Sequence, residues 1–238
     1  MVKLIFFDTE TTGNTEKDFL VQIAYKTDNE SFAELYQPPI KIPPEASAVH
    51  HITNKMVADK PTFKESTDQP IIKKLFEDKN SIVVAHNAPF DLMIIAKEGI
   101  VPKKFICTLR VARELDPESK IERYNLQYLR YLLDIEIEAM AHDALGDVLV
   151  LEKLFERLKN KIMSEENVNE ERAIAKMVEI SSHPSLFRTM NFGKHNGKKI
   201  EEVLACDRGY LEWLLAQKLE SDQIEDDWIY TLQHHLKK

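Results

Sequence analysis

The chain has 238 residues, of which 43% are hydrophobic and 30% charged, a balance typical of a globular protein with a sizeable core. Two distant cysteines, Cys107 and Cys206, argue against a disulfide framework or a zinc motif and favour a reducing compartment. The N-terminal apolar run is too short for a signal peptide or a membrane span, so we expect a cytoplasmic protein without membrane contact. The net charge of −8 argues against a broad basic surface for phosphate backbones, although divalent ions at an acidic site would offset part of it.

The first half of the chain alternates apolar runs with turn residues. Residues 4–8 predict a buried strand that breaks at Gly13, and residues 19–26 and 31–36 predict two more strands, the last antiparallel to its neighbours. The proline-rich residues 38–44 predict an extended loop. Residues 53–58 and 67–77 predict helices, and residues 81–85 predict a β-branched strand. Pro89 then suits the first turn of a helix that stops at Gly99.

The second half of the chain is mainly helical. Residues 108–115, 126–133 and 144–159 predict helices, and in the last of these the apolar residues recur at helical spacing. Strands followed by alternating helix and strand indicate an α/β fold with helices covering the sheet. We expect a first domain over residues 1–165, a helical linker over 166–184, and a small C-terminal α+β module over 185–238, where the composition changes.

Asp8 and Glu10 stand at the end of the first predicted strand. Residues two apart on a strand point to the same face, so both carboxylates project together. Like charges held this close repel unless a cation lies between them. A solvated turn is the alternative interpretation for such a pair, but the apolar run before Asp8 predicts a buried strand, and buried carboxylates need partners.

Three further residues follow in comparable settings. Asp91 lies in the first turn of the helix after a buried strand, where a carboxylate meets the positive end of the helix dipole. Asp147 points inward from the second turn of the long helix, and His142 lies in the loop just before that helix. Each residue alone is compatible with a structural role, as a helix-start acid or an exposed loop histidine. Their order along the chain is the informative feature.

The order Asp-x-Glu, Asn-x-x-Phe-Asp, His-x-x-x-x-Asp resembles the three-motif signature of the DEDDh exonucleases over about residues 1–165. This resemblance implies a ribonuclease-H-like mixed sheet flanked by helices, and a relationship to the proofreading subunit of bacterial DNA polymerase III. The C-terminal segments Phe192–Lys198 and Tyr210–Leu215 look like the C-terminal domain of exodeoxyribonuclease X-like proteins, a shorter and less specific match.

Four carboxylates without a thiolate suit Mg²⁺ or Mn²⁺. The resemblance implies two ions, which Asp8 would bridge, with Glu10 and Asp147 at the water-activating ion and Asp91 at the second. His142 would accept the proton of the attacking water, because a neutral imidazole is available near pH 7. The implied reaction is the 3′→5′ removal of nucleoside 5′-monophosphates from a nucleic-acid strand.

The resemblance and the local sequence also indicate substrate contacts. The residues expected beside the terminal nucleotide or as supports of Asp91 are Thr11, Thr12, Gly13, Ile52, Asn87 and Phe90. In the C-terminal module, Asn196-Gly197 predicts a two-residue hairpin turn that would gather Lys194, Lys198 and Lys199 as candidate phosphate contacts. A solvated basic hairpin without a ligand is the alternative. For Phe192, Tyr210 and Trp213 we favour the core of the small module over a base-stacking surface.

DNA 3′ ends are the substrate favoured by the C-terminal resemblance. RNA ends, as for RNase T or oligoribonuclease, are the alternative, because no residue decisively indicates recognition of a 2′-hydroxyl. A non-catalytic, polymerase-associated subunit is a different class of function. The complete set of carboxylates counts against it. A polymerase or replication partner is compatible with the sequence, which does not fix the oligomeric state.

Overall fold

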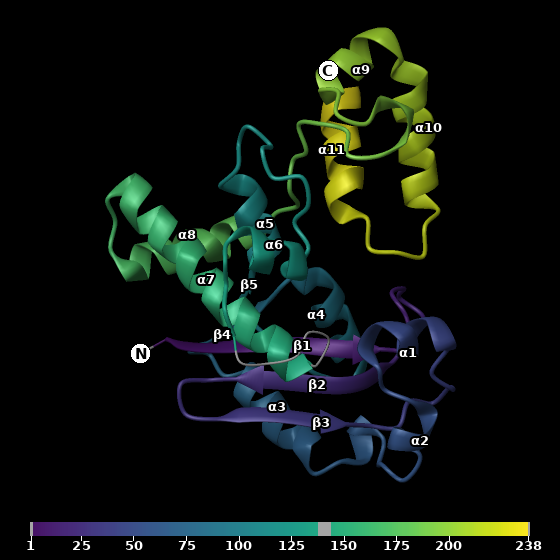
Figure 1. Cartoon of the computed structure of the whole chain (residues 1–238), viewed down its shortest axis with the longest axis vertical. Coiled ribbons are helices and arrows are strands. Elements are labelled where there is room, and N and C mark those ends of the chain that lie inside the picture. Colours follow the sequence, from purple (N-terminus) through teal and green to yellow (C-terminus); the bar gives the residue numbers. More distant parts are fainter. Residues whose placement is uncertain (1, 138–143, 238) are drawn as a thin grey trace.

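A mixed five-stranded sheet forms the centre of the first domain in the computed structural model, which describes residues 2–137 and 144–237 (Figure 1). The strand order is β3-β2-β1-β4-β5. The strands are β1 (Lys3–Thr11), β2 (Leu20–Lys26), β3 (Ser31–Leu35), β4 (Ser81–Ala85) and β5 (Phe105–Cys107). β2 runs antiparallel to β1 and to β3, whereas β1, β4 and β5 are parallel. The expected antiparallel third strand is therefore confirmed.

β1 lies in the middle of the sheet because its residues are apolar on both faces. Ile5, Phe6 and Phe7 are each at most 5% exposed. Lys3 to Phe6 pair with β4, and the register with β2 shifts between Glu10 and Thr11. The pairing with β4 ends at Phe6, so the polar residues after Phe7 lie where β1 extends beyond the carboxyl end of that pairing.

Helices cover both faces of the sheet, and each face has its own core. On one face the long helix α7 (Ala144–Glu166) crosses β1 and β2, and Phe155 packs edge-on against Phe6 with ring centroids 5.2 Å apart. The helices α5 (Thr108–Glu114) and α6 (Leu126–Leu132) pack against α7. On the other face lie α3 (Asp68–Phe76) and α4 (Ala88–Lys97), with Phe76 packed against Phe7.

A small satellite core lies beside the end of the sheet. It joins Val21 of β2 to Ile42, Ile52 and Val57. The elements around it are α1 (Pro44–His50) and α2 (Asn54–Val57), whereas Phe63 of the following turn η1 (Phe63–Glu65) packs in the core on the α3 face. The expected extended loop reaches only to Pro43, since Pro44 begins α1, a position that proline tolerates because it needs no amide donor.

The segment expected to be a helical linker contains α8 (Glu170–Ser181), which packs on the first domain. Ala173 and Met177 are both fully buried in the core beneath α7. Ser181 is also buried, and its hydroxyl accepts a hydrogen bond from the Cys107 amide at 2.8 Å. α8 therefore extends the first domain, and the chain leaves that domain only after Ser181.

The C-terminal unit has a separate core and is almost entirely helical. Its helices are α9 (Ile200–Cys206), α10 (Arg208–Leu219) and α11 (Asp226–Leu236), preceded by the turn η2 (Gly193–His195). Met190, Ile200, Leu211 and Leu232 are among its buried residues. Among the described residues of this unit, the β structure is limited to one isolated bridge between Thr189 and Lys199. The expected turn at Asn196-Gly197 forms, since the Lys198 amide donates to the His195 carbonyl at 3.0 Å, but it does not join two strands, because η2 precedes it and the Gly197 amide donates to the Met190 carbonyl at 2.7 Å.

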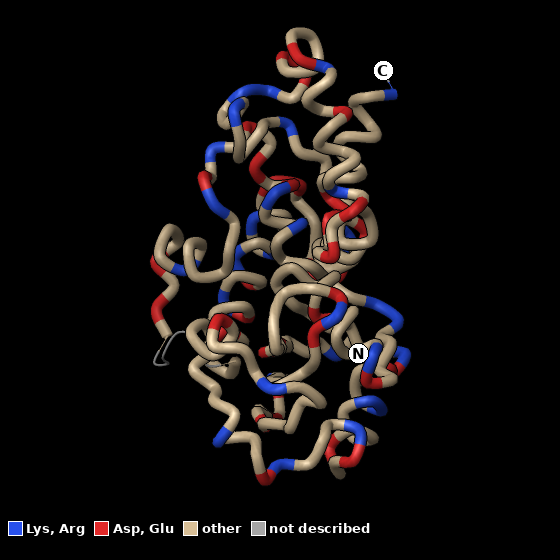
Figure 2. The backbone as a smooth tube through the Cα atoms, turned by 90° about the vertical axis from the view of Figure 1, so that its right-hand side faces the viewer, with Lys and Arg blue, Asp and Glu red and all other residues tan. Residues whose placement is uncertain are grey.

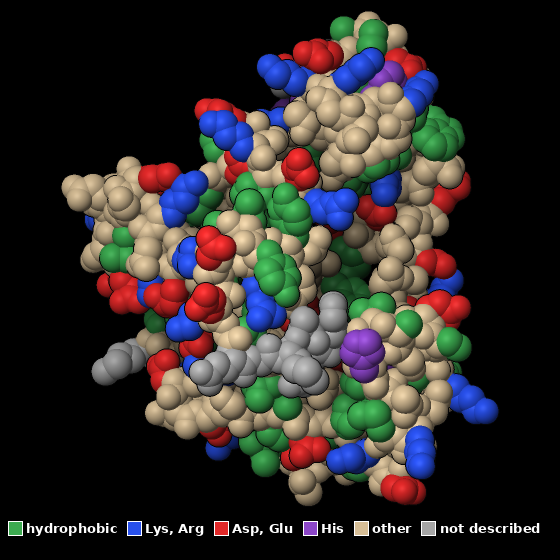
Figure 3. Space-filling model, viewed as in Figure 1, with side chains coloured by type: hydrophobic (Ala, Val, Ile, Leu, Met, Phe, Trp, Pro, Cys, Tyr) green, Lys and Arg blue, Asp and Glu red, His purple; other side chains and the backbone are tan. Residues whose placement is uncertain are grey.

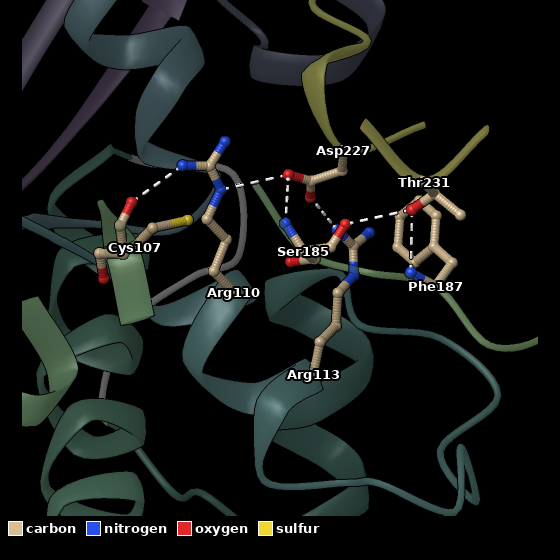
Figure 4. Close-up of polar contacts among 8 residues, drawn as sticks. Cys107, Arg110, Arg113, Ser185, Phe187, Asp227 and Thr231 are labelled. Carbon is tan, nitrogen blue, oxygen red and sulfur yellow. Dashed lines mark hydrogen bonds and ion pairs between the residues drawn. The ribbon is translucent and has the colours of Figure 1, made fainter. Parts of the chain in front are cut away.

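Asp227 of α11 joins the C-terminal unit to α5 of the first domain (Figure 4). Its carboxylate lies 3.2 Å from Arg110 Nε and 2.5 Å from Arg113 Nη1, and it accepts a hydrogen bond from the Ser185 amide at 2.9 Å. Arg110 is 7% exposed in its side chain, so this ion pair is well shielded from water. A second contact joins Asp222 to the β1–β2 loop, where its carboxylate lies 2.6 Å from Lys17 Nζ.

Acidic and basic residues are interspersed along the backbone of both units (Figure 2). The surface is hollowed between the C-terminal unit and the part of the first domain around α1 (Figure 3). Among the described residues, no helix is long and apolar enough to span a bilayer.

Candidate active site

Three carboxylates meet at the end of β1. Asp8 and Glu10 alternate with the buried Thr9 and therefore share one face of the strand. α7 crosses that face and contributes Asp147 from its first turn. One oxygen from each of the three carboxylates lies within 4.8 Å of the others. The structure thus brings together three of the four expected acids in a group of the size that a cation needs.

Burial and the neighbouring negative charges both disfavour the ionised form of Asp8. The pKa of Asp8 is raised well above its ordinary value, first by burial and then by the negative charges of Asp91, Glu10 and Asp147. Without a cation, the site therefore favours protonation of Asp8. A divalent ion would remove this penalty, and an all-oxygen donor set fits hard cations such as Mg²⁺ or Mn²⁺.

Asp91 lies on the other side of β1, in the first turn of α4. Its carboxylate is 4% exposed and accepts two hydrogen bonds from Thr9, from the amide at 3.1 Å and from the hydroxyl at 2.6 Å. Burial raises the pKa of Asp91 to about 7, although the bonds from Thr9 oppose that shift. Asp91 is outside the group of three but close enough to Asp8 to raise its pKa. The position of Asp91 is compatible with a second cation site next to the group of three carboxylates.

The turn that carries Asp91 has an unusual backbone. Asn87 caps α4 with a left-handed conformation, φ 64°, which asparagine tolerates better than most residues. Asn87 is exposed, and Phe90 packs against the core on the α4 face. Just before them, His86 contacts the Thr108 hydroxyl at 2.9 Å and the Tyr124 carbonyl at 2.6 Å. His86 thereby fixes the start of α4 to α5 and to the segment before α6.

Thr11, Thr12 and Gly13 form a compact turn around Asp18. The Thr12 hydroxyl donates to the Asp18 carboxylate at 2.8 Å, and a Cβ on Gly13 would lie 2.7 Å from the same carboxylate. These residues border the carboxylate group along the chain.

Ile52 is 4% exposed in the satellite core, so little of its surface is accessible to a nucleotide.

Other predicted site residues lie apart from the carboxylates or outside the described residues. His142 lies outside the described residues. Lys194 is paired with Asp207 at 2.7 Å in the C-terminal unit. Lys198 and Lys199 are exposed, and no ion pair involves them among the described residues.

Sequence reasoning missed Gln127 of α6. Its side-chain amide donates to the Asp147 carboxylate, while its Oε1 is buried and has no hydrogen-bond partner among the described residues. The same side chain lines an open cavity of about 510 Å³ together with Arg123, Asn125, Tyr128, Tyr131 and Leu132. Nothing in the local sequence distinguishes this glutamine, because its contact to Asp147 depends on how α6 packs against α7.

The comparisons with known proteins agree with this fold. The model of the exonuclease family matches residues 5–155, and that of the exodeoxyribonuclease X-like C-terminal domain matches residues 190–218. The chain therefore belongs to the exonuclease family and carries both of these domains. It is a nuclease that hydrolyses phosphodiester bonds, and its mixed sheet has the expected ribonuclease-H-like fold.

Individual proteins and a solved structure also match this chain. The chain is 32% identical over 206 residues to exodeoxyribonuclease 10 of Escherichia coli K12, covering 86% of this chain and 84% of that protein. It is 32% identical over 161 residues to the DNA polymerase III subunit epsilon of Treponema pallidum, covering 63% and 73%. A solved structure of exonuclease X in complex with 5′ overhanging duplex DNA matches with a TM-score of 0.57 and 28% identity, covering 76% of this chain and 99% of that chain.

Proposed function

We propose that this protein is a DNA exonuclease that depends on two divalent ions and removes nucleoside 5′-monophosphates from the 3′ end of a strand. The observation that carries the proposal is the group of Asp8, Glu10 and Asp147, with Asp91 beside it. DNA is favoured over RNA because a relative that matches most of the chain is named an exodeoxyribonuclease. The epsilon relative supports a replication partner.

The four carboxylates have separate roles in this proposal. Asp8, Glu10 and Asp147 would hold one ion, and Asp8 together with Asp91 would hold the other. When bound, Mg²⁺ or Mn²⁺ activates water and stabilises the leaving oxygen of the scissile phosphate. Thr9 keeps the Asp91 carboxylate oriented, and the burial of Asp91 keeps bulk water from competing for its oxygens.

His142 would take the proton from the attacking water. The supporting observation is its place in the sequence, five residues before Asp147. A neutral imidazole accepts a proton near pH 7 without occupying a metal position.

The remaining residues would bind the strand. Thr11, Thr12 and Gly13 border the carboxylates and would contact the terminal nucleotide, with Asn87 and Phe90 supporting the turn before Asp91. Residues 1–165 would form the exonuclease domain. Residues 185–238 would form a nucleic-acid-binding module, in which Lys194, Lys198 and Lys199 contact phosphates.

The test compares matched DNA and RNA strands, single- and double-stranded, with a label at either end. Mg²⁺-dependent release of mononucleotides from DNA, starting at the 3′ end and stopped by EDTA, is the expected result. Asp8→Asn should abolish release, and Asp59→Asn, which removes an exposed acid far along the chain, should not. Preferential digestion of RNA would show that RNA and not DNA is the substrate. Nucleotide release that continues in EDTA would refute the role of the ions.

A further inference from the structure

The two tryptophans of the protein have opposite environments in the C-terminal unit. Trp228 is 7% exposed and packs between Phe187 and Phe192, with ring centroids 4.5 and 5.0 Å away. Trp213 on α10 is 55% exposed. The small core is thus complete without Trp213, and an indole exposed to this extent is the kind of side chain that a ligand covers in binding proteins.

Trp213 is part of a row of three neighbouring side chains. Its ring centroid lies 5.6 Å from that of Tyr210, one helical turn earlier on α10, at an interplanar angle of 35°. The Lys194 ammonium lies 4.9 Å from the centre of the Tyr210 ring. An ammonium, a phenol and an indole therefore follow one another across the surface.

The loop before α9 holds this row in place. Gly193 has φ +68°, and a Cβ there would lie 2.5 Å from the Tyr210 hydroxyl. His195, 7% exposed, packs against the Tyr210 ring and lies 2.8 Å from Asp207. Asp207 also pairs with Lys194. Tyr210 is thus fixed from two sides, so little side-chain entropy remains to be lost when a ligand stacks on the row.

The charge around the row is positive on the loop side. Residues 188–199 contain Arg188, Lys194, Lys198 and Lys199 and no acidic residue. Arg188 is turned toward the first domain, where it donates to the Pro117 carbonyl. Lys198 and Lys199 are exposed at the end of the loop. Cations beside a pair of neighbouring aromatic rings match a chain of phosphates and bases.

The C-terminal unit is docked on the first domain by the contacts of Asp227 with Arg110 and Arg113. A strand bound on the row would therefore stay tethered to the domain that carries the carboxylate group.

We propose that Lys194, Tyr210 and Trp213 form a binding surface for single-stranded nucleic acid, separate from the carboxylate site. A base would stack on the Trp213 indole, and the flanking phosphates would contact Lys198 and Lys199. The proposal takes from the proposed function only that the substrate is a nucleic-acid strand.

Tryptophan fluorescence tests this surface directly. Unlabelled dT16 is titrated into the full-length protein in EDTA and low salt, and binding of fluorescein-labelled dT16 is followed separately by anisotropy. The wild-type emission should be quenched as the strand binds, and the quenching should weaken as salt rises. Trp213→Phe retains only the buried Trp228, so its emission should stay constant. Wild-type emission that does not change while anisotropy reports binding would overturn the proposal, as would an absence of binding to dT16.

Affinity gives a second readout. Trp213→Ala should raise the Kd for dT16 roughly five- to 150-fold, the range for loss of one stacked base. Trp213→Phe should recover part of that loss. Leu219→Ala removes a similarly exposed apolar side chain, 58% exposed on the same helix, and should leave the Kd unchanged. An unchanged Kd for Trp213→Ala would overturn the proposal and leave Trp213 as a contact for protein.

These readouts are independent of hydrolysis. Quenching by dT16 without any digestion in Mg²⁺ would uphold the surface and refute the exonuclease proposal. Digestion in Mg²⁺ without quenching would do the reverse.

Discussion

Thr9 donates both its amide and its hydroxyl hydrogen to one oxygen of Asp91, at 3.1 and 2.6 Å. The two residues come from β1 and α4, 82 positions apart in the chain. Thr9 points to the face of β1 opposite Asp8 and Glu10. The strand that presents two carboxylates on one face therefore orients a third carboxylate on the other.

This relationship predicts the effect of removing the Thr9 hydroxyl. Thr9→Val keeps the amide donor and the β-branched shape but removes the shorter hydrogen bond. A hydrogen bond to a charged group is worth about 1.5–3 kcal/mol, so turnover at limiting Mg²⁺ should fall roughly ten- to hundredfold. Thr9→Ser should recover most of the rate. Equal rates for Thr9→Val and the wild type, measured by release of a labelled nucleotide, would contradict this role.

Removing the charge of Asp91 should stabilise the metal-free protein. Burial raises the pKa of Asp91 to about 7, above its value in the unfolded chain, so the fold loses stability as pH rises through 7. In EDTA at pH 8, Asp91→Asn should increase the free energy of unfolding by about 2–4 kcal/mol. Urea unfolding measures this, with Asp59→Asn as the control. A destabilised Asp91→Asn protein would indicate that its hydrogen bonds outweigh the burial of its charge.

His86 should give the protein an acid-sensitive step. Burial lowers the pKa of His86 to about 4, whereas the unfolded side chain titrates near 6.5. The unfolded state therefore binds more protons between these values, and the free energy of unfolding should decrease as pH falls from 6.5 to 4, by about 3 kcal/mol in total. Urea unfolding at several pH values in this range measures how steeply the free energy of unfolding depends on pH.

The histidine variants isolate this contribution from the carboxylates, whose raised pKa values act in the opposite direction. His86→Gln should be less stable at pH 7, because it loses contacts to Thr108 and Tyr124, and its slope should be shallower. His183→Gln changes an exposed histidine and should keep the wild-type slope. If the free energy of unfolding of His86→Gln depends on pH as steeply as that of the wild type, a group other than His86 causes the loss of stability in acid.

Gln127 should affect metal affinity through Asp147. Its amide donates to the Asp147 carboxylate, and partners of this kind typically change metal affinity or activity 10- to 100-fold. Gln127→Leu should therefore raise the Mg²⁺ concentration for half-maximal rate by about that factor. Gln127→Glu should not raise that concentration, because the carboxylate that replaces the donor adds a negative charge that attracts the cation. Calorimetric titration with Mn²⁺ checks the affinity independently of turnover, and unchanged binding in Gln127→Leu would contradict the assignment.

The sequence predicted those parts of the site that depend on local spacing. The two-residue period of a strand put Asp8 and Glu10 on one face, and the helical period put Asp147 on the inner face of α7. Both hold in the structure. The helix expected over residues 144–159 continues to Glu166.

Features that depend on packing between distant segments were not predicted. β5 has three residues and becomes a strand only by pairing with β4. Gln127 reaches Asp147 only because α6 packs on α7, and Asp227 meets Arg110 only because the C-terminal unit docks on α5. The turn at Asn196-Gly197 does not join two strands, because η2 precedes it and the Gly197 amide donates to the Met190 carbonyl.

We propose that the carboxylates at the end of β1 hold ions for hydrolysis at a strand's 3′ end. The most direct measurement is single-turnover digestion of a 3′-labelled DNA strand by the wild type and by Asp8→Asn, with Mg²⁺ varied from zero to saturation. We expect Mg²⁺-dependent release of labelled nucleoside 5′-monophosphate by the wild type and none by Asp8→Asn. Release by Asp8→Asn at the wild-type rate, or release by the wild type without Mg²⁺, would contradict it.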